Sequence, residues 1–304
     1  MKLLVMIPAY NEESTVGFVI EETPRKMEGI DSVEILLIDD GSTDSTVREA
    51  QKAGVDFILR HKRNMGLGVA FKNGLNRALA MGEDIIVSID ADMQYSPSEI
   101  SPLIQPILEG KADIVLGNRQ VSFLEHMPTS KKIGNKIASW VTRRASGLSI
   151  SDAQTGFRAF SRKAASKMNL NSSHTYVHEC LVQAGAKNLR VTEVPVAFRE
   201  RKGKSRLISS VWGYAISSGK TLIKVYAQYH PLKAVTLIGL TMALIGTALA
   251  SGFLVGFFEI GKASPYLPIA GSASILLVVS LQAIIFGMLA EKVRKKSRRR
   301  RSVT

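Results

Sequence analysis

Two aspartates one residue apart, Asp90 and Asp92, follow an apolar run at residues 84–89 that is typical of a buried strand. If the backbone turns there, both carboxylates can reach one hard divalent cation, and Gln94 can supply a further oxygen. Mg²⁺ held in this way usually shares its oxygen ligands with a substrate phosphate. The alternative is an ordinary surface turn, where aspartate is common for conformational reasons. The spacing alone does not separate these two interpretations.

The elements that must position these carboxylates alternate along the first half of the chain. Short apolar runs rich in β-branched residues lie at residues 3–7, 34–38, 55–59, 84–89 and 113–117. Helical patterns lie between them, at about 13–27, 43–53, 67–81 and 97–109. This alternation predicts an α/β fold with a doubly wound, mostly parallel sheet.

Polar segments follow three of the predicted strands. They are PAYNEE from Pro8, DDGSTD from Asp39, and DADMQ from Asp90. Ligands of doubly wound sheets bind beyond the carboxyl ends of the strands. We therefore expect these three segments to lie at one functional edge.

The second half of the chain is less regular. Residues 118–130 have no clear period and are expected to form a loop, and a basic helix follows at about 131–147. A helix is expected around 174–186 and a strand within 189–198. Residues 207–228 mix aromatics, leucines and lysines, which fits amphipathic helices at a membrane surface or helices packed on the domain.

Residues 234–258 and 263–290 contain no charged side chain. As helices, both stretches would exceed the ~30 Å hydrocarbon core of a bilayer. Helices in the core of a soluble protein are the alternative, but these seldom run so far without a polar face. Two membrane spans are therefore predicted.

Basic residues dominate the net charge of +14, and many of them flank the predicted spans, as in the tail from Lys292 to Arg301. Positive residues favour the cytoplasmic side, so both termini and the first 200 residues are expected in the cytosol of a two-span protein of the cell membrane. The single Cys180 fits a reducing compartment and is expected to be a buried, unreactive side chain. The tail is expected to contact anionic membrane lipids rather than nucleic acid.

Taken together, five motifs at predicted strand ends resemble the family 2 glycosyltransferases, which have the nucleotide-sugar-binding fold called GT-A. The motifs are PAYNE at 8–12, DDGSTD at 39–44, RNMGLGVAFKNGL at 63–75, DAD at 90–92 and GNR at 117–119. DAQTGFRAF at 152–160, TEVPVAF at 192–198 and RKGKSRL at 201–207 are most similar to the polyprenyl-phosphate sugar synthases, a group that includes the dolichyl-phosphate mannose and glucose synthases. The resemblance covers residues 1–206.

The resemblance implies roles for individual residues. Asp90, Asp92 and Gln94 should bind Mg²⁺ or Mn²⁺, and Asp92 and Arg119 should be catalytic. Arg119, Lys131 and Asn135 should contact the acceptor phosphate, although the family often has Arg and Ser at the last two positions. The nucleotide-sugar-binding set comprises Pro8, Tyr10, Glu12, Ile38, Asp40, Asp90, Ala91, Asp92, Arg119, Arg201 and Arg206. The family often has Lys in place of Arg206, and the choice between Arg199 and Arg201 stays open.

The same resemblance implies a domain plan and a reaction. A GT-A domain at 1–206 would precede amphipathic interface helices at 207–231, two transmembrane helices at 232–290 and a polybasic cytoplasmic tail at 291–304. The implied reaction moves a hexose, with inversion, from a GDP- or UDP-hexose to a polyprenyl (dolichyl) monophosphate. The sugar, the nucleotide, the polyprenol and the oligomeric state are not specified.

Two alternatives remain at this point. A family 2 enzyme acting on a hydroxyl of a glycolipid or polysaccharide would need a general base, for which His178-Glu179 offers a carboxylate. A non-catalytic membrane scaffold could bind a partner through its basic tail. The acidic strand ends argue against a nucleic-acid partner, because carboxylates and phosphates repel.

Overall fold

The computed structural model describes residues 1–125, 127–172, 176–200, 226–227, 231–260 and 267–301. The chain divides into two compact units, Met1–Leu222 and Ile223–Thr304. The predicted interface helices at 207–231 lie mostly outside the described residues, as do Arg201 and Arg206. The four predicted segments remain a prediction for that reason.

The first unit is built on a seven-stranded sheet with the order β3-β2-β1-β4-β6-β5-β7. Its strands are β1 (Lys2–Ala9), β2 (Ser32–Asp39), β3 (Phe57–Arg60), β4 (Ile85–Ser88), β5 (Ile114–Asn118), β6 (Arg158–Ser161) and β7 (Val191–Pro195). All neighbouring pairs are parallel except the two that involve β6. The predicted mostly parallel α/β sheet is confirmed.

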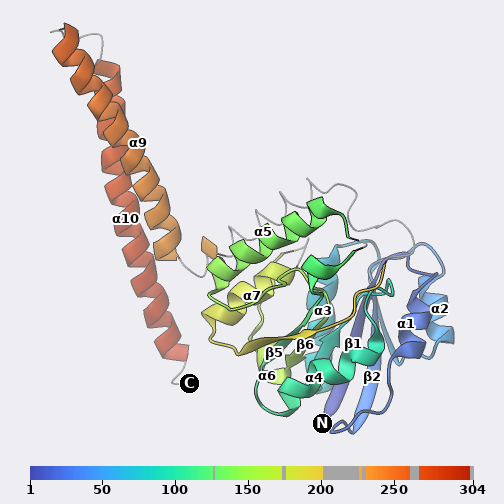
Figure 1. Ribbon diagram of the computed structural model, residues 1–304. Coiled ribbons are helices and arrows are strands. Elements are labelled where there is room, and N and C mark those ends of the chain that lie inside the picture. The colour runs from blue at the N-terminus through green and yellow to red at the C-terminus, as the bar shows by residue number, and fades with distance from the viewer. Residues whose placement is uncertain (126, 173–175, 201–225, 228–230, 261–266, 302–304) are drawn as a thin grey trace. The chain divides into compact units, whose positions relative to one another are not determined.

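Helices cover both faces of this sheet (Figure 1). They are α1 (Val16–Glu22), α2 (Thr46–Lys52), α3 (Leu67–Met81), α4 (Ile100–Leu108), α5 (Thr129–Ser146), α6 (Arg162–Lys167) and α7 (Val177–Ala186), with short 3₁₀ turns η1 (Pro97–Glu99) and η2 (Val121–Phe123). Helix α3 has the predicted bounds and ends at Gly82, whose φ of +89° suits a residue without a side chain. The structure places α5 two residues earlier than its predicted start.

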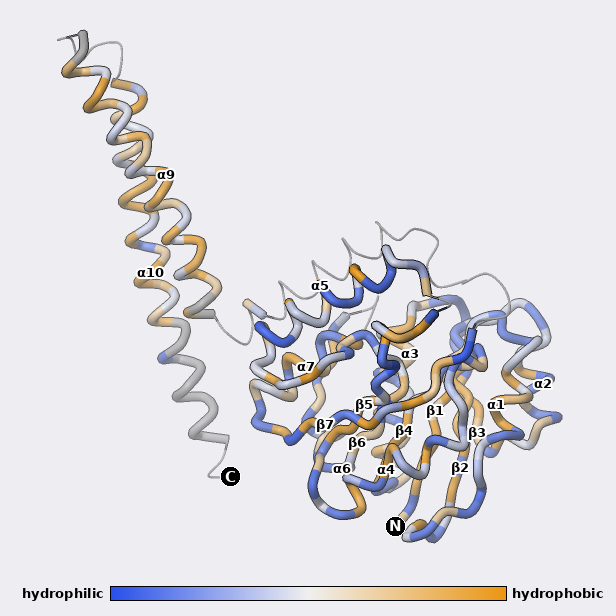
Figure 2. The backbone as a smooth tube through the Cα atoms, in the orientation of Figure 1, coloured by the Kyte–Doolittle hydropathy of each residue, from blue (hydrophilic) through white to orange (hydrophobic). Residues whose placement is uncertain are grey.

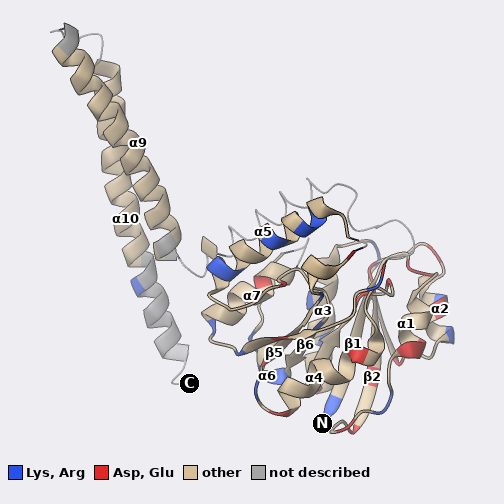
Figure 3. Cartoon of the chain, in the orientation of Figure 1, with Lys and Arg blue, Asp and Glu red and all other residues tan. Residues whose placement is uncertain are grey.

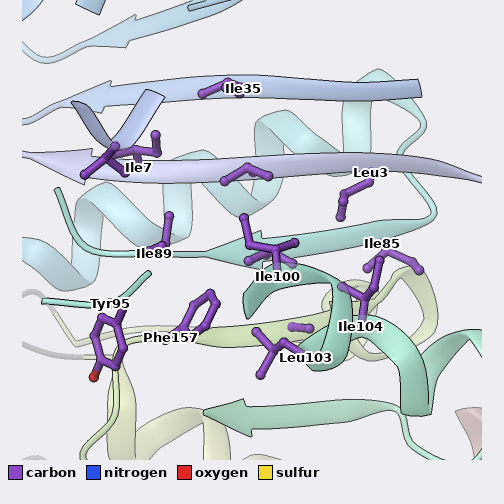
Figure 4. Close-up of a cluster of buried hydrophobic side chains, with 14 of the residues drawn as sticks. Leu3, Ile7, Ile35, Ile85, Ile89, Tyr95, Ile100, Leu103, Ile104 and Phe157 are labelled. Atoms are coloured by element: carbon purple, nitrogen blue, oxygen red, sulfur yellow. The ribbon is translucent and has the colours of Figure 1, made fainter. Parts of the chain in front are cut away.

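Alternating residues of β1 point to opposite faces and build two separate cores. Leu3 and Ile7 belong to a cluster with α1 and α4, which Figure 4 shows with Ile100 and Leu103. Residues Leu4 and Met6 belong to the other cluster, with α3, α6 and α7. Both faces of the strand are buried, which explains why its sequence is a continuous apolar run.

Strand β6 is the main feature that the sequence did not predict. It lies between β4 and β5 and is antiparallel to both, with Arg158 opposite Ser88 and Leu116. Because β6 runs backwards, its first residue lies at the carboxyl ends of its neighbours. The segment 151–157, which precedes β6, is thereby brought to the functional edge of the sheet.

The second unit contains two long helices, α9 (Pro231–Ile260) and α10 (Leu267–Arg301). They include apolar stretches long enough to cross a membrane, Ala234–Phe258 and Leu267–Leu289, which Figure 2 shows mainly in the colours of apolar residues. Most of the side chains in these stretches are not buried. This exposure does not fit core helices of a soluble protein. Small residues allow α9 and α10 to pack closely. At Gly239 of α9, an added Cβ would lie only 2.9 Å from the Ile284 side chain of α10.

Candidate active site at the carboxyl edge of the sheet

The loops after β1 and β2 are joined by hydrogen bonds. The Asn11 amide donates to Ser42 Oγ at 2.9 Å, and the Glu12 amide donates to Thr46 Oγ1 at 2.8 Å. Asn11 takes a left-handed backbone conformation with φ of +56°, which asparagine tolerates better than most residues. These bonds hold the loop after β1, which is predicted to bind the nucleotide, against the loop after β2.

The predicted nucleotide-binding residues of this region lie side by side. Pro8 of β1 is directly opposite Ile38 of β2 in the parallel register, and both are buried. Tyr10 and Glu12 follow on the loop and are half-buried. The backbone therefore brings these four residues to one corner of the sheet edge.

Asp40 holds the loop that leads into α3. Its Oδ1 accepts a hydrogen bond from the Met65 amide at 2.9 Å, and its Oδ2 accepts one from the Gly66 amide at 2.8 Å. His61 Nδ1 lies 2.7 Å from Oδ1. The Asp40 carboxylate is buried and thus fixes the 61–66 loop beside the predicted nucleotide-binding residues.

The chain turns directly after the Asp90-Ala91-Asp92 sequence, as a shared metal site requires. Met93 has a φ of +62°, and the Gln94 amide donates to Asp92 Oδ1 at 3.1 Å. The Arg199 amide donates to the Gln94 carbonyl at 2.8 Å, so the segment after β7 closes over the turn. Ala91 is buried, whereas Asp90, Asp92 and Gln94 are partly exposed.

Asp90 packs against the backbone of Gly156. A Cβ added to Gly156 would lie 2.5 Å from Asp90 Oδ2, which is too close for any real contact. The Gly156 amide donates to Tyr95 Oη at 3.3 Å, and Tyr176 Oη donates to the Gly156 carbonyl at 3.2 Å. Burial raises the pKa of Tyr95 to about 12, so this hydroxyl is neutral.

Arg119 and Asp152 form a buried bidentate ion pair. Arg119 Nε donates to Asp152 Oδ2 at 2.7 Å, and Nη2 donates to Oδ1 at 2.8 Å. Burial opposes the charged form of both groups, but the hydrogen bonds and charges of the pair lower the pKa of Asp152 and raise that of Arg119. The Asp90 carboxylate also acts on Arg119 electrostatically, so the predicted metal ligand and the predicted catalytic cation share one site.

Asn135 of α5 joins the same cluster. Its Nδ2 donates to Asp152 Oδ1 at 3.1 Å and to Gln154 Oε1 at 3.2 Å. Lys131 lies one helical turn earlier on the same face of α5 and is exposed. The structure therefore brings together Arg119 and Asn135, with Lys131 at their margin.

A buried arginine fixes the segment that carries Asp152 and Gly156. Arg158 is fully buried and donates to the carbonyls of Thr155 and Ala153, both at 2.9 Å, and of Val177 at 2.8 Å. Three backbone acceptors satisfy the guanidinium at the start of β6. Arg158 thereby ties the 151–157 segment to the start of α7.

Sequence reasoning gave no role to Asp152 or Gly156, although both belong to the motif at 152–160. Asp152 follows Arg119 by 33 residues, and only the reversed direction of β6 brings the two together. A four-residue strand such as β6 carries no distinct hydrophobic period. The one signal in the sequence that could have indicated a role for Asp152 is its charge within the motif at 152–160.

The candidate base His178-Glu179 is buried on α7 and has a structural role. Glu179 accepts hydrogen bonds from the amides of Asn171 and Ser172, both at 3.0 Å. His178 Nδ1 lies 2.9 Å from Thr142 Oγ1, and burial, together with the charge of Arg158, lowers the pKa of His178 to about 4. Cys180 is also buried, as expected, and burial raises the pKa of its thiol to about 12.

The Arg199 side chain contacts Ser96 and Glu22, whereas its backbone amide bonds to the turn at Gln94. Its Nη2 donates to Ser96 Oγ at 3.0 Å, and Nη1 lies 3.5 Å from Glu22 Oε2. Arg201 and Arg206 fall outside the described residues. The choice between Arg199 and Arg201 as a donor contact stays a prediction.

The donor set at the turn fits a hard divalent cation. Asp90 and Asp92 offer carboxylate oxygens and Gln94 an amide oxygen, which are ligand types that Mg²⁺ and Mn²⁺ prefer. Within the described residues there is no cluster of three His, Cys, Asp or Glu side chains that could hold a metal by themselves. A cation here would need further oxygens from water or a substrate phosphate.

Comparisons with known proteins agree with this geometry. The family described as glycosyl transferase family 2 matches residues 4–168. A UDP-N-acetylglucosamine–dolichyl-phosphate N-acetylglucosaminyltransferase of Methanococcus voltae is 31% identical over 215 residues, covering 64% of this chain and 84% of the relative. A dolichyl-phosphate hexose transferase of Haloferax volcanii is 30% identical, covering 73% of this chain and 93% of the relative.

A solved structure shares the fold. Glucosyl-3-phosphoglycerate synthase from Mycobacterium tuberculosis, in complex with Mn²⁺, UDP-glucose and phosphoglyceric acid, superposes with a TM-score of 0.59 at 21% identity. The match covers 74% of this chain and 80% of that one. The family match spans more than half of the sequence and includes the Asp-x-Asp turn, and so this chain is a glycosyltransferase that belongs to glycosyl transferase family 2.

Proposed function

We propose that this protein is a membrane-bound, inverting hexosyltransferase that moves a hexose from a nucleotide-sugar to a polyprenyl (dolichyl) monophosphate. The observation that carries the proposal is the meeting of the Asp90 turn with the buried Arg119–Asp152 pair at one sheet edge. Two relatives named for transfer to dolichyl phosphate support the acceptor class. Their similarity spans most of their own length.

The donor in this proposal is a GDP- or UDP-hexose. Its nucleoside would lie at the corner formed by Pro8, Tyr10, Glu12 and Ile38, next to the loop that Asp40 fixes. Its diphosphate would extend toward Asp90 and Asp92. Arg201 and Arg206 are proposed to bind the diphosphate as well, on the basis of the sequence motif alone.

Asp90, Asp92 and Gln94 would hold Mg²⁺ or Mn²⁺. When bound, the cation supplies charge stabilisation to the diphosphate leaving group. Arg119 contributes a second, permanent positive charge from the protein itself, and Asp152 fixes its direction with two hydrogen bonds. A preorganised cation of this kind stabilises charge that develops as the glycosidic bond breaks.

The acceptor phosphate needs cations more than it needs a base. The second pKa of a phosphate monoester is ~6, so its oxygen is already ionised at neutral pH. Arg119, Lys131 and Asn135 would position it on the side of the sugar opposite the leaving group, which gives inversion. A hydroxyl acceptor would need a base, and Glu179, the carboxylate considered for that role, is buried and bonded to a backbone loop.

The membrane arrangement completes the proposal. Helices α9 and α10 would cross the cell membrane, with both termini and the catalytic unit in the cytosol because the flanking segments are rich in Lys and Arg. The basic tail would contact anionic lipids. Anchoring confines the enzyme to the surface that carries its lipid acceptor and raises the effective concentration of that acceptor.

An acceptor competition assay tests this function. The purified full chain in lipid nanodiscs is given Mn²⁺ or Mg²⁺, a panel of radiolabelled GDP- and UDP-hexoses, and either a polyprenyl phosphate, the matching polyprenol, or diacylglycerol. We expect radiolabel in the lipid phase only with the phosphate. Transfer to the polyprenol or to diacylglycerol but not to the phosphate would overturn the proposal in favour of the hydroxyl-acceptor alternative.

A further inference from the structure

Helix α5 has a second, outward face that the reaction does not use. Its inward face carries Asn135 and other buried polar residues. Its outward face carries Ile133, Ile137 and Trp140, which are 54%, 58% and 52% exposed. These residues recur at the i, i+4, i+7 spacing of one helical stripe, and such a contiguous exposed apolar stripe usually marks an interaction surface.

The charges around this stripe have a single sign. Helix α5 contains no acidic residue, and its basic residues are Lys131, Lys132, Lys136, Arg143 and Arg144. The blue patches on α5 in Figure 3 show this bias, which contrasts with the acidic α1. The Arg144 guanidinium lies 5.9 Å from the ring centre of Trp140, an arrangement in which a cation covers an aromatic side chain.

The outward face lies one helix away from the candidate active site. Asn135 is bonded to Asp152 on the inward face, so the distance to the opposite side of α5 is about one helix diameter, ~10 Å. Figure 1 shows α5 along the end of the domain where the carboxyl end of β1 lies. Whatever covers the outward face is therefore close to the site.

We propose that the outward face of α5, defined by Ile133, Lys136, Ile137, Trp140 and Arg144, docks on the anionic surface of a lipid bilayer. Its composition fits an interfacial helix, in which apolar and Trp side chains enter the headgroup region while Lys and Arg bind anionic headgroups. The inference rests on the membrane anchoring in the proposed function. It assigns a contact to a helix of the catalytic domain itself, far in sequence from the spans.

Docking would set the height of the active site above the bilayer. Lys131 and Asn135 lie on the inward face, so α5 would stand between them and the headgroups. A lipid-linked phosphate would then pass beside the first turn of α5 to reach Lys131. The helix thereby becomes a positioning element for the acceptor.

Fluorescence of Trp140 gives a direct test. The sequence has two tryptophans, so Trp212→Phe leaves Trp140 as the single reporter in the full chain. The protein is reconstituted in nanodiscs of phosphatidylcholine and phosphatidylglycerol, with or without lipids brominated near the headgroup end of the acyl chain. We expect brominated lipid to quench Trp140 emission, and acrylamide in the water phase to quench it weakly.

Two matched variants separate docking from chance proximity. Lys136→Glu with Arg144→Glu reverses the charge of the face, and we expect quenching by brominated lipid to be lost. A reporter moved to α1, by Phe18→Trp in a Trp140→Phe and Trp212→Phe background, is also exposed but lies beside Glu21 and Glu22. We expect that reporter to be quenched by acrylamide and not by brominated lipid.

Three results would overturn the inference. Strong acrylamide quenching of Trp140 without lipid quenching would mean a solvated face. Protection from both quenchers would mean that a second copy of the chain, or another segment of the same chain, covers it. Equal lipid quenching of the Phe18→Trp reporter would mean non-specific adsorption. If sugar transfer continues in any of these cases, the proposed function stands although the docking inference fails. If lipid quenches Trp140 but no sugar is transferred, the docking inference stands and the proposed function fails.

Discussion

At the scale of single residues, the candidate site depends on one buried carboxylate. Asp152 holds Arg119 through two hydrogen bonds and Asn135 through a third. Without Asp152 the guanidinium would lose its bidentate partner in a largely buried position, which is costly. A structural ion pair therefore orients a group that we place between the two substrate phosphates.

The Asp152→Asn variant tests this role. Removing one partner of a buried ion pair costs ~3–5 kcal/mol, so we expect a large fall in the midpoint of thermal unfolding. The exposed pair between Asp31 and the N-terminus is the control, since ion pairs at the surface contribute little to stability. Equal, small effects of Asp152→Asn and Asp31→Asn would show that the Arg119 pair is not a buried pair in solution.

Gly156 is a second residue whose identity the site requires. Its φ lies outside the left-handed region, so the backbone conformation itself permits alanine. The new Cβ would meet the Asp90 carboxylate, however, and that carboxylate would have to shift. We expect Gly156→Ala to weaken Mn²⁺ binding, measured by electron paramagnetic resonance titration, by about 10- to 100-fold, as for other changes that displace a metal ligand indirectly.

Gly134→Ala is the matched control for this substitution. Gly134 lies on α5, where an added Cβ would meet open space. We expect its Mn²⁺ affinity to equal that of the wild type. If Gly156→Ala binds Mn²⁺ as tightly as Gly134→Ala does, the Asp90 carboxylate is not a ligand or is free to move.

At the scale of secondary structure, local patterns predicted the parallel elements and missed the antiparallel one. The strands β1 and β2 have eight residues each and contain long buried runs because both of their faces are covered, and such runs are visible in a sequence. The end of α3 at Gly82 is also a local signal. Strand β6 has only four residues, and its direction depends on pairing with β4 and β5, which no local pattern encodes.

The same limit applies to the candidate site. The Asp-x-Asp turn, Arg119 and the loop from Pro8 follow strands directly, so their meeting at one edge could be predicted. The partners Asp152 and Gly156 come from the 151–157 segment, whose position depends on β6. The binding of substrates by these predicted site residues stays a prediction.

The opposite, amino edge of the sheet makes a prediction about pH. Glu83 lies between α3 and β4, where burial and the nearby Glu34 raise its pKa from 4.5 to about 7. A group whose pKa is higher in the folded state stabilises the fold fully below its unfolded pKa, and this contribution is lost as pH rises through the folded value. Between pH 5 and pH 8, ionisation of Glu83 should therefore destabilise the wild type.

Glu83→Gln removes this titration and keeps the shape of the neutral acid. We expect the variant to gain thermal stability relative to the wild type at pH 8 and to lose most of that advantage at pH 5. The exposed Glu28→Gln is the control and should show little difference at either pH. An advantage of Glu83→Gln that is the same at both pH values would contradict a raised pKa in the folded state.

At the scale of the whole molecule, the chain combines a glycosyltransferase domain with two long apolar helices. The length and composition of α9 and α10 agree with the two stretches that the sequence marks as spans, and their apolar side chains are mostly exposed. The sequence could predict these helices because a span is defined by a continuous local property. Their orientation in the membrane rests on charge distribution alone and remains a proposal.

The central claim of this account is electrostatic. Carboxylates at the tip of β4 would recruit a divalent cation that neutralises the leaving diphosphate, while Arg119 would face the incoming lipid phosphate. Loss of one of only two carboxylate ligands should remove most of this stabilisation. The matched control is Asp31→Ala, which removes an exposed carboxylate at the amino edge of the sheet.

The most direct measurement is Mn²⁺-dependent transfer of labelled hexose to polyprenyl phosphate by the wild type, Asp92→Ala and Asp31→Ala in nanodiscs. We predict transfer by the wild type and by Asp31→Ala that stops when excess chelator is added, and no transfer by Asp92→Ala at any Mn²⁺ concentration. Full transfer by Asp92→Ala, or by the wild type in excess chelator, would contradict the account.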